Sequence, residues 1–341
     1  MSIPPPPPLF SLRGHDGAVN SLCYIGSENL VSGDVLGKVN IWNLEGRMVI
    51  AALDEAHEHS VLSVNRLPGG ESFATCSRDG TVKIWDLETC HSGSKVPKLT
   101  LQTQARCFCN ASTDFDTSSS GDKNLVLTAG SEESSVLLWD TRTSQVACHM
   151  NVSQEQGMVS SLLLVNGASG GASIALVGCD DGSLTCVDLR LGQTVSRVQQ
   201  LHHGESGPQP LLAIAAYAQA GTASLNVLTG GGDCHLQRCQ LEKSELRIAN
   251  CTVTLPAVGT SSIACRCDGR LIAAAHWDKT VRLYDSKRLK PLAVLRHHQD
   301  SAFGVAFGIQ GTPGQALLAS SGKDGLIAIW DIYSDKLNAA V

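Results

Sequence analysis

Hydrophobic and polar residues alternate in short runs over most of this 341-residue chain. "KVNIW" at 38–42, "TVKIW" at 81–85 and "TVRLY" at 280–284 each send alternate side chains to one face, as strands of a half-buried sheet do. The most apolar window, "LLAIAAYA" at 211–218, has the length of a buried strand and is too short to cross a membrane. The pattern predicts an all-β protein with many short strands and no membrane-spanning segment.

The strands recur with a Trp-Asp pair, as in "VKIWDL" at 82–87 and "IAIWDI" at 327–332. Successive first positions are 43, 54, 48, 52, 45 and 46 residues apart, at or above the spacing of about 40–45 residues in a WD-repeat blade. The sequence therefore contains seven passages of one pattern, which resembles the WD repeat. The pairs are Trp42-Asn43, Trp85-Asp86, Trp139-Asp140, Val187-Asp188, Cys239-Gln240, Tyr284-Asp285 and Trp330-Asp331.

A turn signal precedes five of these seven strands. Six residues before the Trp or its substitute, five repeats carry an aspartate, which accepts hydrogen bonds from nearby backbone N–H groups and tolerates turn geometry. The first and third repeats carry Leu36 and Glu133 instead. The five turn aspartates are Asp79, Asp181, Asp233, Asp278 and Asp324.

Histidines stand at the head of some repeats, in Gly14-His15, Ala56-His57 and His297-His298. They resemble the Gly-His element of WD repeats, which implies a buried hydrogen-bonded set of a His, a turn Asp, a strand hydroxyl and the Trp. A buried imidazole and indole both need fixed partners, so we expect a structural role for these residues and no catalysis or metal binding. Repeats four to six do not show the element clearly, and "HHGESGPQP" at 202–210 is typical of a mobile loop.

The predicted fold is all-β: a seven-bladed WD-repeat β-propeller whose blades are four-stranded antiparallel sheets. "LFSLRGH" at 9–15 precedes the first full repeat and the last one ends near Ile332, so the N-terminal strand is expected to complete the final blade and close the ring. Residues 9–341 then form a single domain after a proline-rich disordered tail at 1–8. Pro4–Pro8 is either a stiff spacer or a ligand for an aromatic-lined groove, and Ser118–Ser120 lie in either a solvated loop or a phosphorylation site.

Composition narrows the class of protein. The net charge of −6 and the scattered Lys and Arg provide no cationic patch for nucleic acid. Thirteen cysteines without a secretory signal pattern predict reduced thiols and a cytoplasmic or nuclear location. Cys107 and Cys109 are spaced by one residue, which favours small core fillers over a metal site, and we expect no cofactor and no metal.

The sequence has no phosphate loop ending in Gly-Lys-Ser/Thr and no paired carboxylates in a local motif. A propeller hydrolase assembled from distant blades is the enzymatic alternative. A rigid, non-enzymatic platform for protein–protein interaction is the favoured class.

One candidate partner-binding residue is Trp277 in "AAHWDKTV" at 274–281. It precedes the turn Asp278, where other repeats have residues such as Arg78 and Lys323. We expect its indole to be partly exposed, and exposed tryptophans are enriched among interface hot spots. The alternative is packing against a neighbouring turn.

Two further candidates are Arg142 and Arg190, each two residues after the Asp of its repeat. The arrangement resembles the Trp-Asp-x-Arg motif of WD-repeat substrate receptors for cullin-RING ubiquitin ligases, in which the Arg helps to dock the adaptor. An exposed or blade-bridging charge is the alternative.

The last two repeats carry a more specific resemblance, in "AAAHWDKTVRLYDSKRLKPLAVLRHHQDSAFGVAF" at 273–307. With the proline-rich start leading into "FSLRGH", this stretch resembles the family of guanine nucleotide-binding protein subunit beta-like protein 1, whose fungal relative is ASTRA-associated protein 1. The resemblance implies an adaptor, monomeric within a complex, linked to the co-chaperone machinery that matures phosphatidylinositol-3-kinase-related kinases. Its implied partners are co-chaperone subunits and client kinases, with no direct contact to nucleic acid or membrane.

Overall fold

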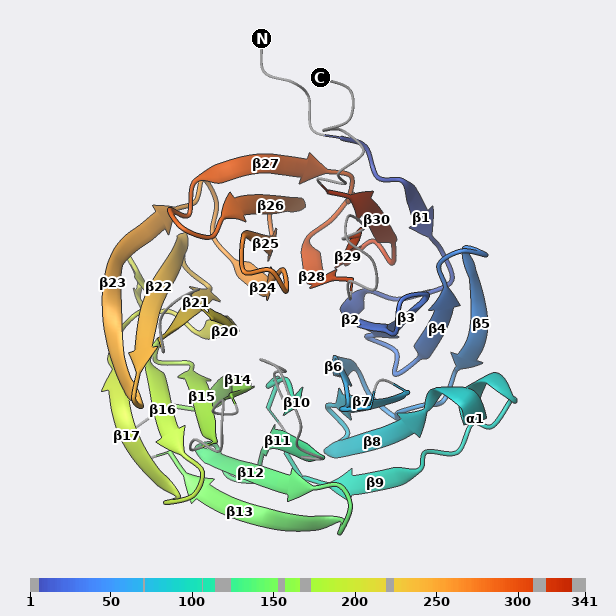
Figure 1. Cartoon of the computed structure of the whole chain (residues 1–341), viewed down its shortest axis with the longest axis horizontal. Coiled ribbons are helices and arrows are strands. Elements are labelled where there is room, and N and C mark those ends of the chain that lie inside the picture. Colours follow the sequence, from blue (N-terminus) through green and yellow to red (C-terminus); the bar gives the residue numbers. More distant parts are fainter. Residues whose placement is uncertain are drawn as a thin grey trace.

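The computed structural model describes residues 6–69, 71–105, 107–113, 124–152, 157–165, 173–218, 224–308 and 317–332. Seven four-stranded antiparallel sheets follow one another around a ring, and each sheet runs from the centre to the outside (Figure 1). The prediction of a seven-bladed propeller is confirmed. Among the described residues, no helix is long and apolar enough to span a membrane.

Each blade is built from consecutive strands, starting with the innermost. The first three blades are β2 (Val19–Ile25), β3 (Asn29–Asp34), β4 (Val39–Asn43) and β5 (Met48–Leu53); β6 (Val61–Arg66), β7 (Ser72–Ser77), β8 (Thr81–Asp86) and β9 (Leu99–Gln102); and β10 (Ser112–Thr113), β11 (Leu125–Ala129), β12 (Ser135–Asp140) and β13 (Gln145–Asn151). A short helix, α1 (Leu87–His91), follows β8.

The next three blades follow the same order. They are β14 (Val159–Val165), β15 (Ile174–Cys179), β16 (Leu184–Asp188) and β17 (Gln193–Val198); β20 (Leu211–Ala218), β21 (Leu225–Gly231), β22 (His235–Glu242) and β23 (Glu245–Thr254); and β24 (Thr260–Cys265), β25 (Leu271–His276), β26 (Thr280–Asp285) and β27 (Pro291–Arg296).

The seventh blade closes the ring. Its inner strands are β28 (Ala302–Phe307), β29 (Leu317–Gly322) and β30 (Ile327–Asp331), and its outer strand is β1 (Phe10–Leu12) from the other end of the chain. Phe10 lies opposite Ile329 and Leu12 opposite Ile327 in an antiparallel ladder. The predicted closure by the N-terminal strand is therefore confirmed, and β30 has no open edge.

The hydrophobic core is divided among the seven junctions between blades. Each of seven apolar clusters joins residues of two adjacent blades, so the ring has no single central core. The second strands are the most buried, because blades cover both of their faces. At the closing junction, Leu12 and Ile329 of the last blade pack in one cluster with Trp42 of the first.

The loops lie on two faces of the ring. Because neighbouring strands of a blade run antiparallel, the loops after the second and fourth strands lie on one face and those after the first and third lie on the other. We call these the upper face and the lower face. The turn aspartates predicted from the sequence belong to the upper face, whereas the residues that follow each Trp-Asp pair belong to the lower face.

One segment differs from the sequence prediction. Residues 202–210 were expected to form a mobile loop, but β18 (His203–Gly204) pairs with β19 (Gly207–Pro208) in a small hairpin on the upper face. His202 at its base is fully buried. The Gly-rich composition of this segment serves a tight turn, in which Gly207 has φ +111°.

Candidate functional site

The predicted histidine sets are present in blades one, two and seven. In blade two, Nδ1 of His57 lies 2.9 Å from Oδ2 of Asp79, and Nε2 lies 2.7 Å from the Thr75 hydroxyl. The Trp85 indole N–H donates to the same hydroxyl at 2.9 Å. Blade seven repeats the arrangement with His298, Asp324, Ser320 and Trp330.

Blade one forms the same set with an aspartate at a different position. Nδ1 of His15 lies 2.7 Å from Oδ2 of Asp34, and Nε2 lies 2.7 Å from the Ser32 hydroxyl, which also accepts from the Trp42 indole. When the repeats are aligned, Leu36 stands at the position where five other repeats have the turn aspartate. Asp34, two residues earlier, takes over that role, and Leu36 points outward with 60% of its surface exposed.

Blade five contains a set that the sequence reasoning missed. Nδ1 of His202 lies 2.9 Å from Oδ1 of Asp233, and Nε2 lies 2.9 Å from the Thr229 hydroxyl. All three residues are buried. Cys239 stands in place of the Trp, so this set lacks an indole. The signal was present in the sequence as a His far upstream of a turn Asp, but the inserted hairpin disguised its spacing.

The remaining blades use their turn residues differently. Asp181 in blade four forms a 2.6 Å ion pair with Arg197, and Asp278 in blade six does so with Arg282. Blade three keeps the indole bond from Trp139 to the Thr128 hydroxyl without a histidine among its described partners. The turn aspartates therefore share a position, but in two blades they bind arginine.

In five repeats, the Asp or Asn that follows the Trp or its substitute has a separate task on the lower face. Asp86 accepts a hydrogen bond from the Thr89 N–H at the start of α1, and Asp188 accepts from the Arg190 N–H. Asn43 and Asp285 accept from backbone N–H groups three residues on. The Trp-Asp pair thus repeats because the Trp joins the upper-face set and the Asp holds the next turn.

The histidine sets are suited to holding the fold and not to catalysis. Burial lowers the pKa of His57 and His298, and each neighbouring aspartate opposes that shift without reversing it. Burial alone would raise the pKa of Asp79, but hydrogen bonds from His57 and Thr81 bring it below its usual range. In each set, both ring nitrogens of the histidine have a hydrogen-bond partner, so the imidazoles of these sets are not free to move a substrate proton. Among the described residues, no group of three His, Cys, Asp or Glu side chains is arranged to hold a metal ion.

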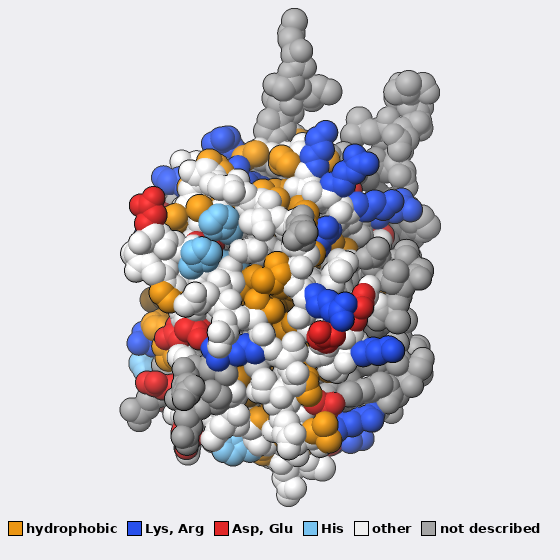
Figure 2. All heavy atoms as spheres, turned by 90° about the vertical axis from the view of Figure 1, so that its left-hand side faces the viewer, with side chains coloured by type: hydrophobic (Ala, Val, Ile, Leu, Met, Phe, Trp, Pro, Cys, Tyr) orange, Lys and Arg blue, Asp and Glu red, His pale blue; other side chains and the backbone are white. Residues whose placement is uncertain are grey.

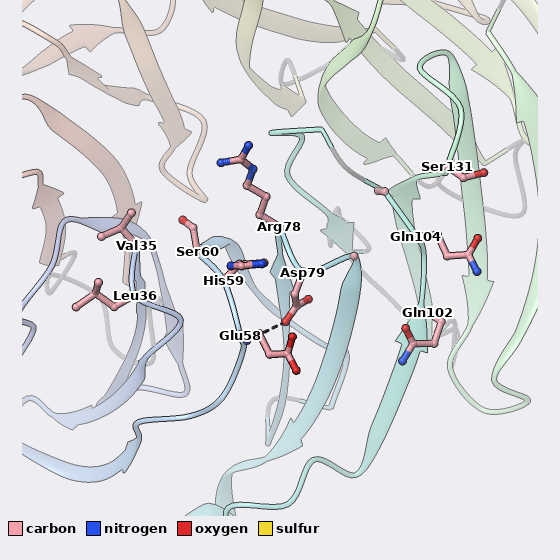
Figure 3. A pocket seen from close by; sticks show the side chains of 12 residues that line it. Val35, Leu36, Glu58, His59, Ser60, Arg78, Asp79, Gln102, Gln104 and Ser131 are labelled. Carbon is pink, nitrogen blue, oxygen red and sulfur yellow. Dashed lines mark hydrogen bonds between the residues drawn. The ribbon is translucent and has the colours of Figure 1, made fainter.

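A hollow of about 1350 Å³ opens on the upper face where blades one, two and three meet (Figure 3). Figure 3 shows Val35 and Leu36 on one side and Gln102 and Gln104 on the other, with Arg78 projecting from the turn between them. The sequence analysis did not single out this place. The lining residues are Val35, Leu36, Glu58, His59, Ser60, Arg78, Asp79, Gly80, Gln102, Gln104, Ala105 and Ser131.

The upper face changes character farther round the ring. Glu132 and Glu133 in blade three are followed by Asp180 and Asp181 in blade four. Burial and the neighbouring charges of Asp181 and Glu133 raise the pKa of Asp180. This acidic sector adjoins the hollow that carries Arg78.

Trp277 lies on the upper face in the turn of blade six. Its side chain is 41% exposed, and its inner part covers Gly259, whose φ of +92° and missing Cβ leave room for the ring. A Cβ at this glycine would overlap the indole. Trp277 is therefore partly exposed and also packs on a neighbouring turn, so each of the two expectations holds for one part of the side chain.

Arg142 and Arg190 lie on the lower face, on adjacent blades and on the side opposite Trp277. Arg142 donates to both carboxylate oxygens of Asp140, at 3.2 and 2.9 Å. The three candidate partner-binding residues therefore define two separate surfaces. Pro4, Pro5 and Ser118–Ser120 lie outside the described residues.

Exposed apolar side chains also occur on the outer side of the ring. Figure 2 shows hydrophobic side chains near the middle of the side where β17 and β23 lie, and Val195 and Ile248 of these strands are exposed. The Leu246 N–H donates to the Ser196 hydroxyl at 3.0 Å and links the two outer strands.

Fold and histidine sets together define the class: the chain is a seven-bladed WD-repeat β-propeller. The WD domain, G-beta repeat family matches residues 6–43, 50–86, 250–285 and 289–331, which include the three complete histidine sets.

Over most of its length the chain is similar to a more specific group. It is 28% identical over 339 residues to guanine nucleotide-binding protein subunit beta-like protein 1 of Mus musculus, covering 97% of both chains. It is 25% identical to ASTRA-associated protein 1 of Verticillium alfalfae, covering 96% of this chain and 93% of the relative, and 24% identical to that of Schizosaccharomyces pombe, covering 96% and 99%. The resemblance seen in residues 273–307 is thus confirmed across the chain.

Proposed function

We propose that this protein is a non-enzymatic adaptor that works within a complex linked to the ASTRA assembly. The observation that carries the proposal is the end-to-end similarity to relatives named ASTRA-associated protein 1. A match confined to a few blades would reflect shared repeats alone. These alignments cover almost the whole of both chains, so they include the divergent middle blades. The geometry supports a binding role, because the conspicuous histidines are used to hold turns.

The finer proposal is that the adaptor serves the co-chaperone machinery that matures phosphatidylinositol-3-kinase-related kinases. Its partners would be co-chaperone subunits and client kinases, bound by a monomeric propeller through loops of the upper or lower face. A rigid ring suits this role, since loops on a fixed scaffold present a surface at little entropic cost. We place the protein in the cytoplasm or nucleus, which agrees with thirteen cysteines that are all free thiols.

The test is affinity purification of the tagged full-length chain from its own cells, with an unrelated WD-repeat propeller as the matched control. Specific recovery of kinase co-chaperone subunits or of the kinases supports the proposal. Recovery of neither overturns it. Recovery of a cullin adaptor that is lost in an Arg142→Ala, Arg190→Ala variant would assign the chain to ubiquitin-ligase receptors instead.

A further inference from the structure

The hollow between blades one, two and three brings three features together in one place on the upper face. The first is its apolar wall. Val35 and Leu36 are 44% and 60% exposed, although they occupy a tight turn between β3 and β4. In blades two and seven, the residue equivalent to Leu36 is an aspartate that bonds the histidine. In blade one, Asp34 bonds the histidine, and Leu36 is exposed to solvent.

Asp34 holds the backbone of the blade-one turn. Oδ1 of Asp34 accepts from the backbone N–H groups of Leu36 and Lys38, at 2.9 and 3.0 Å. Val35 and Leu36 also cover Gly17, whose missing Cβ leaves room for them. The parts of both residues that stay exposed rim the hollow, as apolar side chains do at interaction sites. The apolar wall therefore offers a ligand the exposed side of residues whose other side packs on Gly17.

The second feature is a cation without a carboxylate. Three other cations near the upper face have one: Arg197 pairs with Asp181, Arg282 with Asp278, and Lys323 with Asp300. Lys279 donates instead to the backbone carbonyl of Gln299. For Arg78, no carboxylate of the described residues lies within ion-pair distance. Its guanidinium instead lies 4.3 Å from the ring centre of Phe108, which is itself 66% exposed.

Stacking on Phe108 fixes the plane of the guanidinium and leaves its edge open. A guanidinium held in this way retains donors in a fork that matches a carboxylate, and it loses little side-chain entropy on binding. Figure 3 shows Arg78 projecting away from Asp79, whose oxygens accept from His57, Thr81 and the Glu58 N–H. Arg78 is thus free to meet a ligand.

The third feature is a pair of exposed amides opposite the apolar wall. Gln102 ends β9, and Gln104 follows with φ +57°, a left-handed conformation that non-glycine residues seldom adopt. The Gln104 N–H donates to Gly80 O, which holds the residue at the rim. A carboxamide carries a donor and an acceptor side by side, the pattern that pairs with a peptide backbone.

We propose that this hollow binds an extended segment of a partner protein that carries an aspartate or glutamate beside a large apolar residue. The apolar side chain packs on Val35 and Leu36, the carboxylate pairs with Arg78, and the amides of Gln102 and Gln104 bond the peptide backbone. A volume of about 1350 Å³ exceeds that of a usual small-molecule pocket and takes several residues. The inference rests on the proposed adaptor function and names one of its docking surfaces.

The test uses the purified full-length protein and a displayed library of random linear peptides. Selected sequences are synthesised, and their binding is measured by fluorescence polarisation. We expect an acidic residue next to Leu, Ile or Phe in the selected peptides. We also expect at least about tenfold weaker binding by Arg78→Glu and by Leu36→Asp, the loss typical of an interface hot spot. Lys323→Glu is the matched charge reversal on the same face and should bind as the original chain does.

A change of specificity provides a second readout. Arg78→Glu should favour peptides in which lysine replaces the acidic residue. If no peptide is selected, if the selected peptides lack the acidic residue, or if Arg78→Glu and Lys323→Glu bind them equally, the proposed site is wrong. The affinity purification described above decides the adaptor proposal separately, because it identifies the proteins recovered by the original chain whichever surface binds them.

Discussion

Nδ1 of His15 lies 2.7 Å from Oδ2 of Asp34, although Asp34 stands two residues before the position at which the other turn aspartates occur. The turn of blade one thereby keeps the hydrogen-bonded set of a WD repeat while its usual aspartate position becomes Leu36. One carboxylate serves the imidazole and two backbone N–H groups at once. The residue that holds this turn, Asp34, is therefore a different one from the residue exposed at its tip, Leu36.

The first prediction concerns this carboxylate. Asp34→Ala should lower the free energy of unfolding by about 3 kcal/mol, because it leaves a buried imidazole and two turn N–H groups without their acceptor. Urea unfolding followed by tryptophan fluorescence measures the change. Leu36→Ala is the control, and its exposed side chain should cost less than about 0.5 kcal/mol. Equal losses in the two variants would show that Asp34 does not hold the turn.

The second prediction concerns ring closure. Leu12 is 2% exposed in the junction between blades seven and one, so Leu12→Ala should cost about 2–4 kcal/mol, the usual range for a truncated core leucine. Leu9, which precedes β1 and is half exposed, provides the control Leu9→Ala. Deleting residues 9–14 removes the outer strand and should lower the melting temperature of the whole ring in one transition. An unchanged melting temperature after the deletion would mean that β1 does not contribute to closure.

The success of the sequence analysis had a physical basis in the Trp-Asp pair. The Trp must reach the hydroxyl of the second strand and the Asp must hold the following turn, so spacing alone located seven third strands, even where Val187 or Cys239 replaces the Trp. The same periodicity could not locate His202, because a hairpin lies between this histidine and β20. It also assigned the first turn to Leu36, since Asp34 is displaced by two residues.

The candidate surface residues show a different limit. Sequence position placed Trp277 on a turn before the third strand and Arg142 after such a strand, which is enough to assign opposite faces once the strand directions are known. The hollow, by contrast, draws on three blades. Leu36, Arg78 and Gln104 are far apart in the chain and share no motif, so their proximity follows only from the closed ring.

The third prediction is a pH dependence of stability. Burial, followed by the charge of Arg282, lowers the pKa of His276 to about 4 from its usual 6.5. Between pH 6.5 and 4, His276 therefore binds a proton in the unfolded chain but stays neutral in the folded chain. The stabilisation from a neutral His276 is complete above pH 6.5 and is lost as the pH falls towards 4, by about 3 kcal/mol in total.

Buried His57 and His298, whose pKa values are also lowered, add to this slope in the same direction. Unfolding free energies measured by urea titration from pH 7 to pH 4 test the prediction. His276→Gln should show a shallower slope than the original chain, whereas His203→Gln, at an exposed position of the β18–β19 hairpin, should keep the slope. A slope that is unchanged in His276→Gln would place the uptake of the proton elsewhere.

The fourth prediction separates the two roles of Trp277. Gly259→Ala puts a methyl group where the indole lies and imposes φ +92° on a residue that avoids it, so this variant should lose about 2 kcal/mol of stability and displace the ring. Trp277→Ala creates no such clash and leaves Gly259 in place. Because 41% of the side chain is exposed, this variant should lose less stability than Gly259→Ala.

Capture of the co-chaperone subunits in the affinity purification then tells the roles apart. If Trp277 is an interface residue, Trp277→Ala and Gly259→Ala both reduce the recovery of the same partner, since one removes the indole and the other moves it. Lys279→Ala, two residues away in the same turn, is the matched exposed control and should retain the partner. If both Trp and Gly variants capture the partner fully and differ from the original chain in stability alone, the indole acts as a cover for Gly259. The adaptor then binds through a surface other than the Trp277 turn, and the hollow of blades one to three is the next one to test.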